Sequence, residues 1–140
     1  MLIGFEDAFT SVQADYISLC LELAQNNADI VYAYIYQDSD MEMFNAFFRK
    51  DGKLHTADDF GSDEMVDRFL DIGVDDITKL VEVCDRYEHK CPNQNKMTYD
   101  VKTKHFDAQY VYADSEEDVD PNEVFFAWLE EEKNRPAGTK

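Results

Sequence analysis

Carboxylates are the chemically active side chains that this sequence concentrates most strongly. Residues 114–132 contain nine Asp or Glu residues and no Lys or Arg, and the segment includes large apolar side chains at 125, 126, 128 and 129. Carboxylates gathered in this way can bind a divalent cation, act as catalytic acids, cover a solvated helix face or contact a basic partner. The identity and spacing of the neighbouring residues decide between these possibilities.

A calcium loop is excluded by two positions of the acidic segment. If the loop begins at Asp114, it requires Gly at its sixth position and a bidentate Glu at its twelfth. The sequence has Val119 and Phe125 at these positions. The acidic segment therefore does not predict an EF-hand site.

The usual arrangements of catalytic and cofactor-binding residues are also missing. Cys84, His89 and Cys91 are close in sequence but form no C-x-x-C pair, and a structural zinc ion needs four ligands. The sequence has no G-x-S-x-G nucleophile motif, no G-x-G-x-x-G and no phosphate-binding P-loop. We therefore predict that the protein is not an enzyme and that it holds no metal and no cofactor.

Composition favours a globular protein with a cationic partner. The chain has 140 residues, the length of one domain, and 44% of them are hydrophobic, which is enough for a packed core. Its net charge of −18 argues against direct binding to nucleic acid or anionic lipid, because both require a positive surface. The charge favours a cationic partner or simply high solubility. We predict one domain over residues 1–140 and a partner with a basic surface.

The expected location is the cytoplasm. The chain begins M-L-I-G-F-E-D, without the basic and apolar regions of a signal peptide, and no window approaches the length of a transmembrane helix. The three cysteines are odd in number and form no disulfide framework, as is usual in a reducing compartment.

Apolar periodicity and capping residues predict the helices. An amphipathic helix is expected over residues 5–26. A second begins at the Ser62 cap, with Met65 and Ile72 on its apolar face; we expect it to be interrupted at Gly73 and capped again at Asp75 or Asp76. The last helix is expected to run from the Asp120 cap to about residue 134, with Phe125, Phe126, Trp128 and Leu129 mostly in the core.

Alternating apolar residues and turn signals predict the strands. Asp51-Gly52 predicts a hairpin. Strands are expected over residues 30–36, 41–48, 53–57, 97–102 and 105–112. The predicted fold class is α+β with the order αβββαββα, an antiparallel five-stranded sheet with helices packed mainly on one face.

The acidity is concentrated in two blocks of the sequence. Residues 58–76 contain eight acids with Arg68 as the single base, and residues 114–132 contain nine acids and no base. Helix starts explain part of this, because carboxylates are favourable at the positive end of a helix. The acids at 116–118 and 130–132 have no such role, and near a helix C-terminus each costs about 0.3–1 kcal/mol. These acids indicate a surface for a partner rich in Lys and Arg.

Three features together resemble the YezG-type antitoxin family of immunity proteins. They are F-F-R-K-D-G-K-L-H at 47–55, the middle pair of helices, and the ending Y-x-Y-x-D followed by D-P-N-E-V-F-F-A-W-L-E at 120–130. The resemblance covers most of the chain in layout and implies a small protein that neutralises a secreted toxin, often a nuclease. It implies no catalytic residues. The last helix departs from the family pattern, because F-F-A-W-L replaces a more mixed and basic helix.

The mechanism implied by this resemblance is blockade of a basic substrate channel by an acidic surface. Steered association and charge complementarity would favour such a complex, and exposed aromatic residues would anchor it. Tyr110 and Tyr112 are candidate anchors, whereas Trp128 is expected in the core. The predicted partner-binding residues are Glu116, Glu117, Asp118, Asp120, Asp58, Asp59, Asp63, Asp67, Tyr110, Tyr112, Glu130 and Glu131.

The alternative function is that of an acidic adaptor, or of a regulator that mimics nucleic acid toward a DNA-binding protein. Both functions use a basic partner, so the charge of the chain does not separate them. A neighbouring gene for a toxin with a nuclease domain favours the immunity protein, and an unrelated operon favours the adaptor.

Overall fold

The computed structural model describes residues 4–38, 41–112 and 120–134 and has the predicted order of elements. This part of the chain contains three α-helices, five strands and one short 3-10 helix. They are α1 (Phe5–Leu23), β1 (Ile30–Gln37), β2 (Glu42–Lys50), β3 (Lys53–Thr56), η1 (Ala57–Asp59), α2 (Asp63–Arg86), β4 (Gln94–Asp100), β5 (His105–Val111) and α3 (Pro121–Lys133). The α+β class and the order αβββαββα are confirmed.

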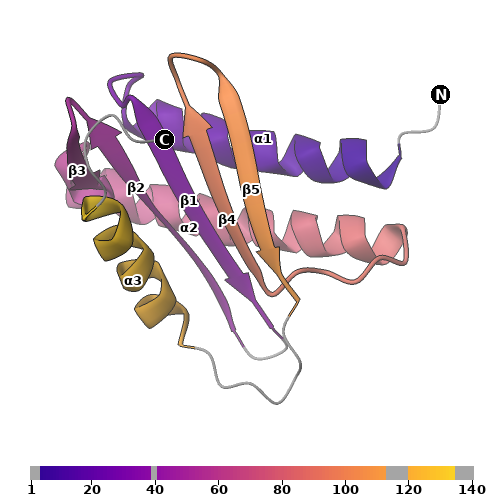
Figure 1. Cartoon of the computed structure of the whole chain (residues 1–140). Helices are drawn as coiled ribbons and strands as arrows, with labels where there is room; N and C mark the ends of the chain where they lie inside the picture. Colours follow the sequence, from indigo (N-terminus) through magenta and orange to yellow (C-terminus); the bar gives the residue numbers. More distant parts are fainter. Residues whose placement is uncertain (1–3, 39–40, 113–119, 135–140) are drawn as a thin grey trace.

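The strands form one antiparallel sheet in the order β3-β2-β1-β4-β5 (Figure 1). β1 lies in the centre, where Val31 is opposite Phe48 of β2 and Tyr99 of β4. Asp51 and Gly52 join β2 to β3 with positive φ angles of 52° and 80°, as a tight two-residue hairpin turn requires. The predicted hairpin is therefore confirmed.

α1 and α2 lie side by side on one face of the sheet and run antiparallel to each other (Figure 1). Their apolar sides pack against alternate residues of the strands, such as Val31, Ala33 and Ile35 of β1. Successive side chains of a strand point to opposite faces, so these three share the face that the helices cover. The prediction that helices pack mainly on one face holds for the two long helices.

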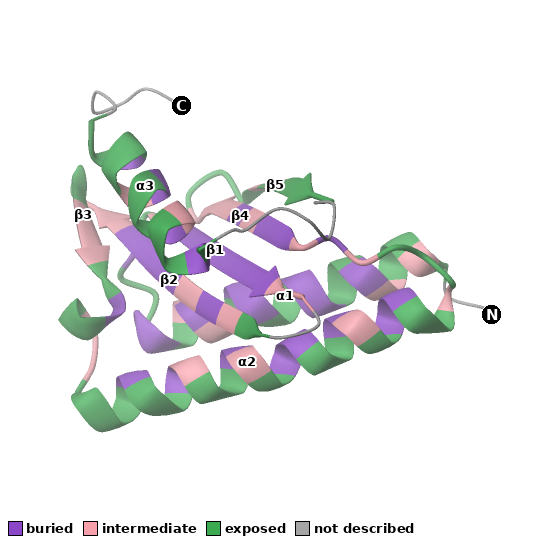
Figure 2. Cartoon of the chain, turned by 90° about the horizontal axis from the view of Figure 1, so that it is seen from below, coloured by how far each residue is buried: buried purple, intermediate pink, exposed green. Residues whose placement is uncertain are grey.

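α3 covers the opposite face of the sheet (Figure 2). The ring of Trp128 lies 5.0 Å from that of Phe47 and 5.7 Å from that of Tyr32, and Phe125 is buried in the same cluster. The prediction that Trp128 belongs to the core is confirmed. The same prediction for Phe126 is wrong. Phe125 and Trp128 are buried against the sheet, so Phe126 lies on the outward side of α3 and is exposed.

α2 is one uninterrupted helix, so the predicted break at Gly73 is wrong. A Cβ atom placed on Gly73 would lie 2.0 Å from Cδ2 of Phe44, a residue of β2. The carbonyl oxygen of Gly73 also accepts a hydrogen bond of 2.7 Å from the hydroxyl of Tyr16. The absence of a side chain at Gly73 therefore allows α2 to pack closely against Phe44 of β2 and Tyr16 of α1. Asp76, a predicted second cap, is buried within the helix and pairs with Lys79 at 3.2 Å.

The other two predicted caps are present at the starts of α2 and α3. Oγ of Ser62 accepts a hydrogen bond from the backbone N–H of Met65 at 3.3 Å. Oδ1 of Asp120 accepts one from the backbone N–H of Asn122 at 3.0 Å, and Pro121 occupies the first helical position. Each cap satisfies a backbone donor that has no partner within its helix.

Buried tyrosines predict a loss of stability at high pH. Desolvation raises the pKa of Tyr16, Tyr32 and Tyr34 above the ordinary value of 10. In the unfolded chain these tyrosines ionise near pH 10, whereas in the folded state they stay protonated to higher pH. Their contribution to the free energy of unfolding is therefore complete below pH 10 and is lost as the pH rises above it. We expect each such tyrosine to lower the free energy of unfolding by up to about 1.4 kcal/mol per pH unit there.

Urea unfolding at a series of pH values measures this effect. Tyr16→Phe removes one ionising hydroxyl and is expected to make the alkaline loss shallower, whereas Tyr110→Phe changes an exposed tyrosine and serves as the control. An alkaline slope that is the same in wild type and Tyr16→Phe would show that burial of this hydroxyl does not cause the loss.

Candidate functional site

The two long helices carry half of the net charge. α1 has four acids and no base, and α2 has eight acids and three bases, so together they contribute −9 of the total −18. The β2–β3 hairpin, residues 42–56, and the β4–β5 hairpin, residues 94–111, each have two acids and three bases. The exposed residues of α1 and α2 point away from the sheet (Figure 2). We call this outer surface the acidic layer.

Four aspartates are spaced one turn apart along α2. Asp63, Asp67, Asp71 and Asp75 follow one another at intervals of four residues, and all are exposed. Four residues advance a helix by about 6 Å, so these carboxylates form a continuous line, which we call the α2 stripe. Asp63 and Asp67 are among the predicted partner-binding residues. The four-residue spacing is the signal in the sequence that also identifies Asp71 and Asp75.

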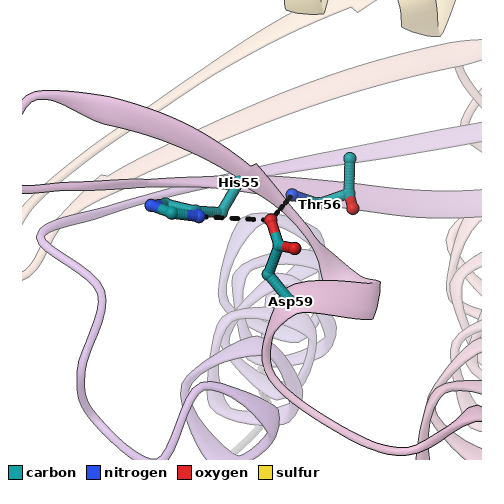
Figure 3. Close-up of polar contacts among 3 residues, drawn as sticks. All are labelled: His55, Thr56 and Asp59. Atoms are coloured by element: carbon teal, nitrogen blue, oxygen red, sulfur yellow. Dashed lines mark hydrogen bonds and ion pairs between the residues drawn. The ribbon is translucent and has the colours of Figure 1, made fainter.

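The two predicted acids that precede α2 have different surroundings. Asp58 is exposed in η1. The carboxylate of Asp59 accepts a hydrogen bond from the backbone N–H of Thr56 at 3.3 Å and lies 3.1 Å from Nδ1 of His55 (Figure 3). Thr56 and Asp59 form a capping box that starts η1. Asp59 therefore has a local structural role beside the predicted one.

A groove of about 420 Å³ lies between α1 and α2 in the acidic layer. Leu19 and Leu23 of α1 and Met65, Phe69 and Ile72 of α2 supply its apolar surface. The polar residues that line it are Glu22, Glu64 and Arg68. Met65 and Ile72 belong to the predicted apolar face of α2, but their side chains remain 43% and 40% exposed, because the groove leaves them uncovered in the described part of the chain.

The described members of the second predicted acidic group are separated from the first group by the sheet. Glu116, Glu117 and Asp118 of the second group lie outside the described residues. Asp120 caps α3, and Glu130 and Glu131 are exposed on the same helix. Because α3 and α2 lie on opposite faces, the described acids of the two predicted groups do not form one surface (Figure 2).

The acidic end of α3 is partly used by the fold, which corrects the expectation that residues 130–132 serve only a partner. Glu132 is buried, and its backbone carbonyl accepts a hydrogen bond of 2.8 Å from Nη2 of Arg49. Nε of Arg49 donates to the hydroxyl of Tyr32 at 3.1 Å. A guanidinium is favourable at a helix C-terminus, because the last carbonyls carry partial negative charge.

The two predicted aromatic anchors lie away from the groove. Tyr110 accepts a hydrogen bond of 2.9 Å from Nε2 of Gln13, and its ring is 5.7 Å from that of Phe9 in the first half of α1. The ring of Tyr112 is 6.5 Å from that of His89, beyond the end of α2. The groove lies at the opposite ends of these two helices. The exposed large apolar residues of α2 are Met65 and Ile72.

The cysteines are poor nucleophiles in this structure. Cys20 and Cys84 are buried and Cys91 is half-buried, and desolvation raises the pKa of all three thiols. Because the thiolate is the reactive form, these residues lack the usual features of a catalytic cysteine. Within residues 4–38, 41–112 and 120–134, no three His, Cys, Asp or Glu side chains are grouped so as to hold a metal ion.

A second hollow, of about 430 Å³, lies between α3 and the strands β4 and β5. Lys96, Asp100 and Asp107 line it, and Nζ of Lys96 lies 5.6 Å from the ring centre of Trp128. Charges of both signs are thus present in this hollow. Glu131 and Glu132 also line it, so its carboxylates outnumber the single lysine.

No protein-family model matches the sequence, and a comparison with curated proteins finds no match. Among the helices that the structure describes, none combines the length and the apolar character that a membrane crossing needs. The acidic layer and the groove within it are the features from which a function can be argued.

Proposed function

We propose that this protein is an immunity protein that binds and neutralises a cognate toxin in the cytoplasm, and that the toxin is a nuclease. The observation that carries the proposal is the acidity of the outer helical layer, with −9 on α1 and α2 and a slight positive charge on each of the two hairpins. Like charges on one layer repel each other and lower the stability of the fold. A basic partner would convert this repulsion into attraction across an interface.

A nuclease fits this surface because it must hold a phosphate backbone with Lys and Arg. A line of carboxylates on a helix can occupy such a basic channel and exclude the nucleic acid. Long-range attraction would also accelerate association by about 10- to 1,000-fold at low salt. Inhibition by occlusion requires no catalytic group in the inhibitor, and the resemblance to YezG-type antitoxins supports a toxin as the partner.

The first test reverses three charges of the α2 stripe, with Asp67→Lys, Asp71→Lys and Asp75→Lys together. We expect the affinity for the toxin domain to fall at least about tenfold, mainly through slower association, and the difference to shrink as salt screens the charges. Binding kinetics with the product of the neighbouring gene, inactivated in its catalytic residues, measure this effect. Inhibition of the active toxin gives an independent readout.

The matched control reverses three exposed acids on the other face, with Asp107→Lys, Glu123→Lys and Glu130→Lys. It changes the net charge by the same amount. Because the proposal assigns binding to α1 and α2 and not to α3, where the predicted residue Glu130 lies, the control is expected to alter affinity by less than about threefold. Equal weakening by both triple variants would assign binding to net charge alone and remove the acidic layer as the contact surface. A neighbouring gene product that is neither toxic nor bound would count against the immunity function itself.

The regular α2 stripe favours one alternative, a regulator that mimics nucleic acid toward a DNA-binding protein. Its carboxylates are spaced by about 6 Å along a rigid rod, and evenly spaced negative charge is also the feature that such proteins read in a phosphate backbone. In that case duplex DNA would compete with this protein for its partner, and the partner expressed alone would not be toxic.

A further inference from the structure

The groove between α1 and α2 exposes apolar side chains that the fold itself does not cover. Met65 and Ile72 are 43% and 40% exposed beside the buried side chains of Leu23 and Phe69. Exposed apolar surface that is continuous with a groove is typical of a contact site. Methionine suits such a site, because its unbranched side chain adapts to differently shaped partners.

The rim of the groove determines the charge of an occupant. Glu22 of α1 and Glu64 of α2 line it, and Arg68 is the only base among its described lining residues. Asp71 continues the α2 stripe beyond it, and α1 contributes no base. Any segment that enters the groove therefore meets an apolar floor with two carboxylates and one guanidinium at its rim.

We propose that the groove binds an amphipathic helical segment of the toxin, with a basic polar face. This inference rests on the proposed function and identifies the part of the toxin that makes the contact. Met65 and Ile72 are seven residues apart, which corresponds to about 10 Å along α2. Apolar side chains two turns apart on a partner helix, at i and i+7, match this separation. Lys and Arg residues beside them would pair with Glu22 and Glu64.

Charge complementarity excludes the simplest other occupant, a second copy of this chain. Each copy carries −18, and α1 and α2 together carry half of it. Pairing two acidic layers would place like charges opposite each other, which opposes association. A cationic occupant gains from the same carboxylates.

Three synthetic peptides of about four helical turns serve as probes. One has Leu at i, i+4 and i+7 with Lys on the other face; the second has Ser in place of Leu and the same number of Lys residues. We expect the full-length wild-type protein to bind the Leu/Lys peptide at least about tenfold more tightly than the Ser/Lys peptide, as measured by titration calorimetry. The third, a Leu/Glu peptide, is expected not to bind.

The double variant Met65→Ser with Ile72→Ser is expected to bind the Leu/Lys peptide about tenfold more weakly than the wild type does. Its affinity for the Ser/Lys peptide is expected to change little. The control is Met41→Ser with Val111→Ser, because these side chains are 43% and 42% exposed but lie outside the groove. Circular dichroism and thermal unfolding of both double variants test whether each one still folds.

The outcomes separate this inference from the proposed function. If both Lys peptides bind equally, or if the groove variant and its control lose the same affinity, the groove is not the docking site while an electrostatic contact surface remains. If neither Lys peptide binds better than the Leu/Glu peptide, the groove inference and the acidic contact surface both fail.

Discussion

Replacing Gly73 by alanine is expected to lower the free energy of unfolding by about 2 kcal/mol or more. The added Cβ would lie 2.0 Å from Cδ2 and 2.5 Å from Cγ of Phe44. That ring cannot move aside easily, because Phe44 is buried and its centroid lies 5.2 Å from that of Tyr16 and 5.1 Å from that of Phe69. The better helix propensity of alanine, about 1 kcal/mol, offsets only part of this cost.

A double-mutant cycle with Phe44→Ala tests the cause. Without the ring, the added Cβ has space, so Gly73→Ala is expected to be neutral or stabilising by up to about 1 kcal/mol in that background. Urea unfolding followed by circular dichroism gives the coupling energy. Gly4→Ala is the control, because a Cβ there meets nothing within 4 Å. If Gly73→Ala costs the same with and without the Phe44 ring, the contact is not the reason for the glycine.

The second large effect is expected for Trp128→Ala, which should lower the free energy of unfolding by about 3–5 kcal/mol. The indole packs edge-on against Phe47 and Tyr32, and Nζ of Lys96 lies 5.6 Å from its centre. The hydrophobic cluster that holds α3 in place consists of strand residues and its own side chains. Removal of the indole is therefore expected to release α3 before the rest of the fold.

Hydrogen exchange distinguishes this local release from global unfolding. In Trp128→Ala the amides of α3 are expected to lose protection while those of β1 and α2 keep most of theirs. Phe126→Ala is the matched control on the same helix, since its ring is 54% exposed and that of Trp128 only 8%. It is expected to change stability by less than about 0.5 kcal/mol. Equal effects of the two substitutions would contradict the assignment of Trp128 as the anchor of α3.

The elements themselves are encoded by neighbouring residues and were predictable. The Ser62 and Asp120 caps form with backbone N–H groups two or three residues away. The Asp51-Gly52 turn depends on two adjacent residues that tolerate positive φ. Interactions over so few residues have only a few geometries, so the sequence predicts their location and the resulting order αβββαββα.

The candidate site was predictable in composition but not in arrangement. Its α2 stripe lies within the acidic block of residues 58–76, and the four-residue spacing makes its geometry visible in the sequence. The contribution of α1 to the acidic layer depends on which helix packs beside α2. Nor can periodicity show that Met65 and Ile72 stay exposed, because the same pattern describes a buried face and the rim of a groove.

Sequence alone determined the class of fold, the helix caps, the central hairpin and the excess of acid. Tertiary structure alone decided that α3 packs opposite α1 and α2, so that the described acids of the two predicted groups lie on different faces. It also decided that Gly73 is a point of close contact within a continuous helix. The physical reason is the sequence separation of the interacting residues. Caps and turns are made by residues a few positions apart, whereas packing joins Gly73 to Tyr16 and Phe44, which are far away in the chain.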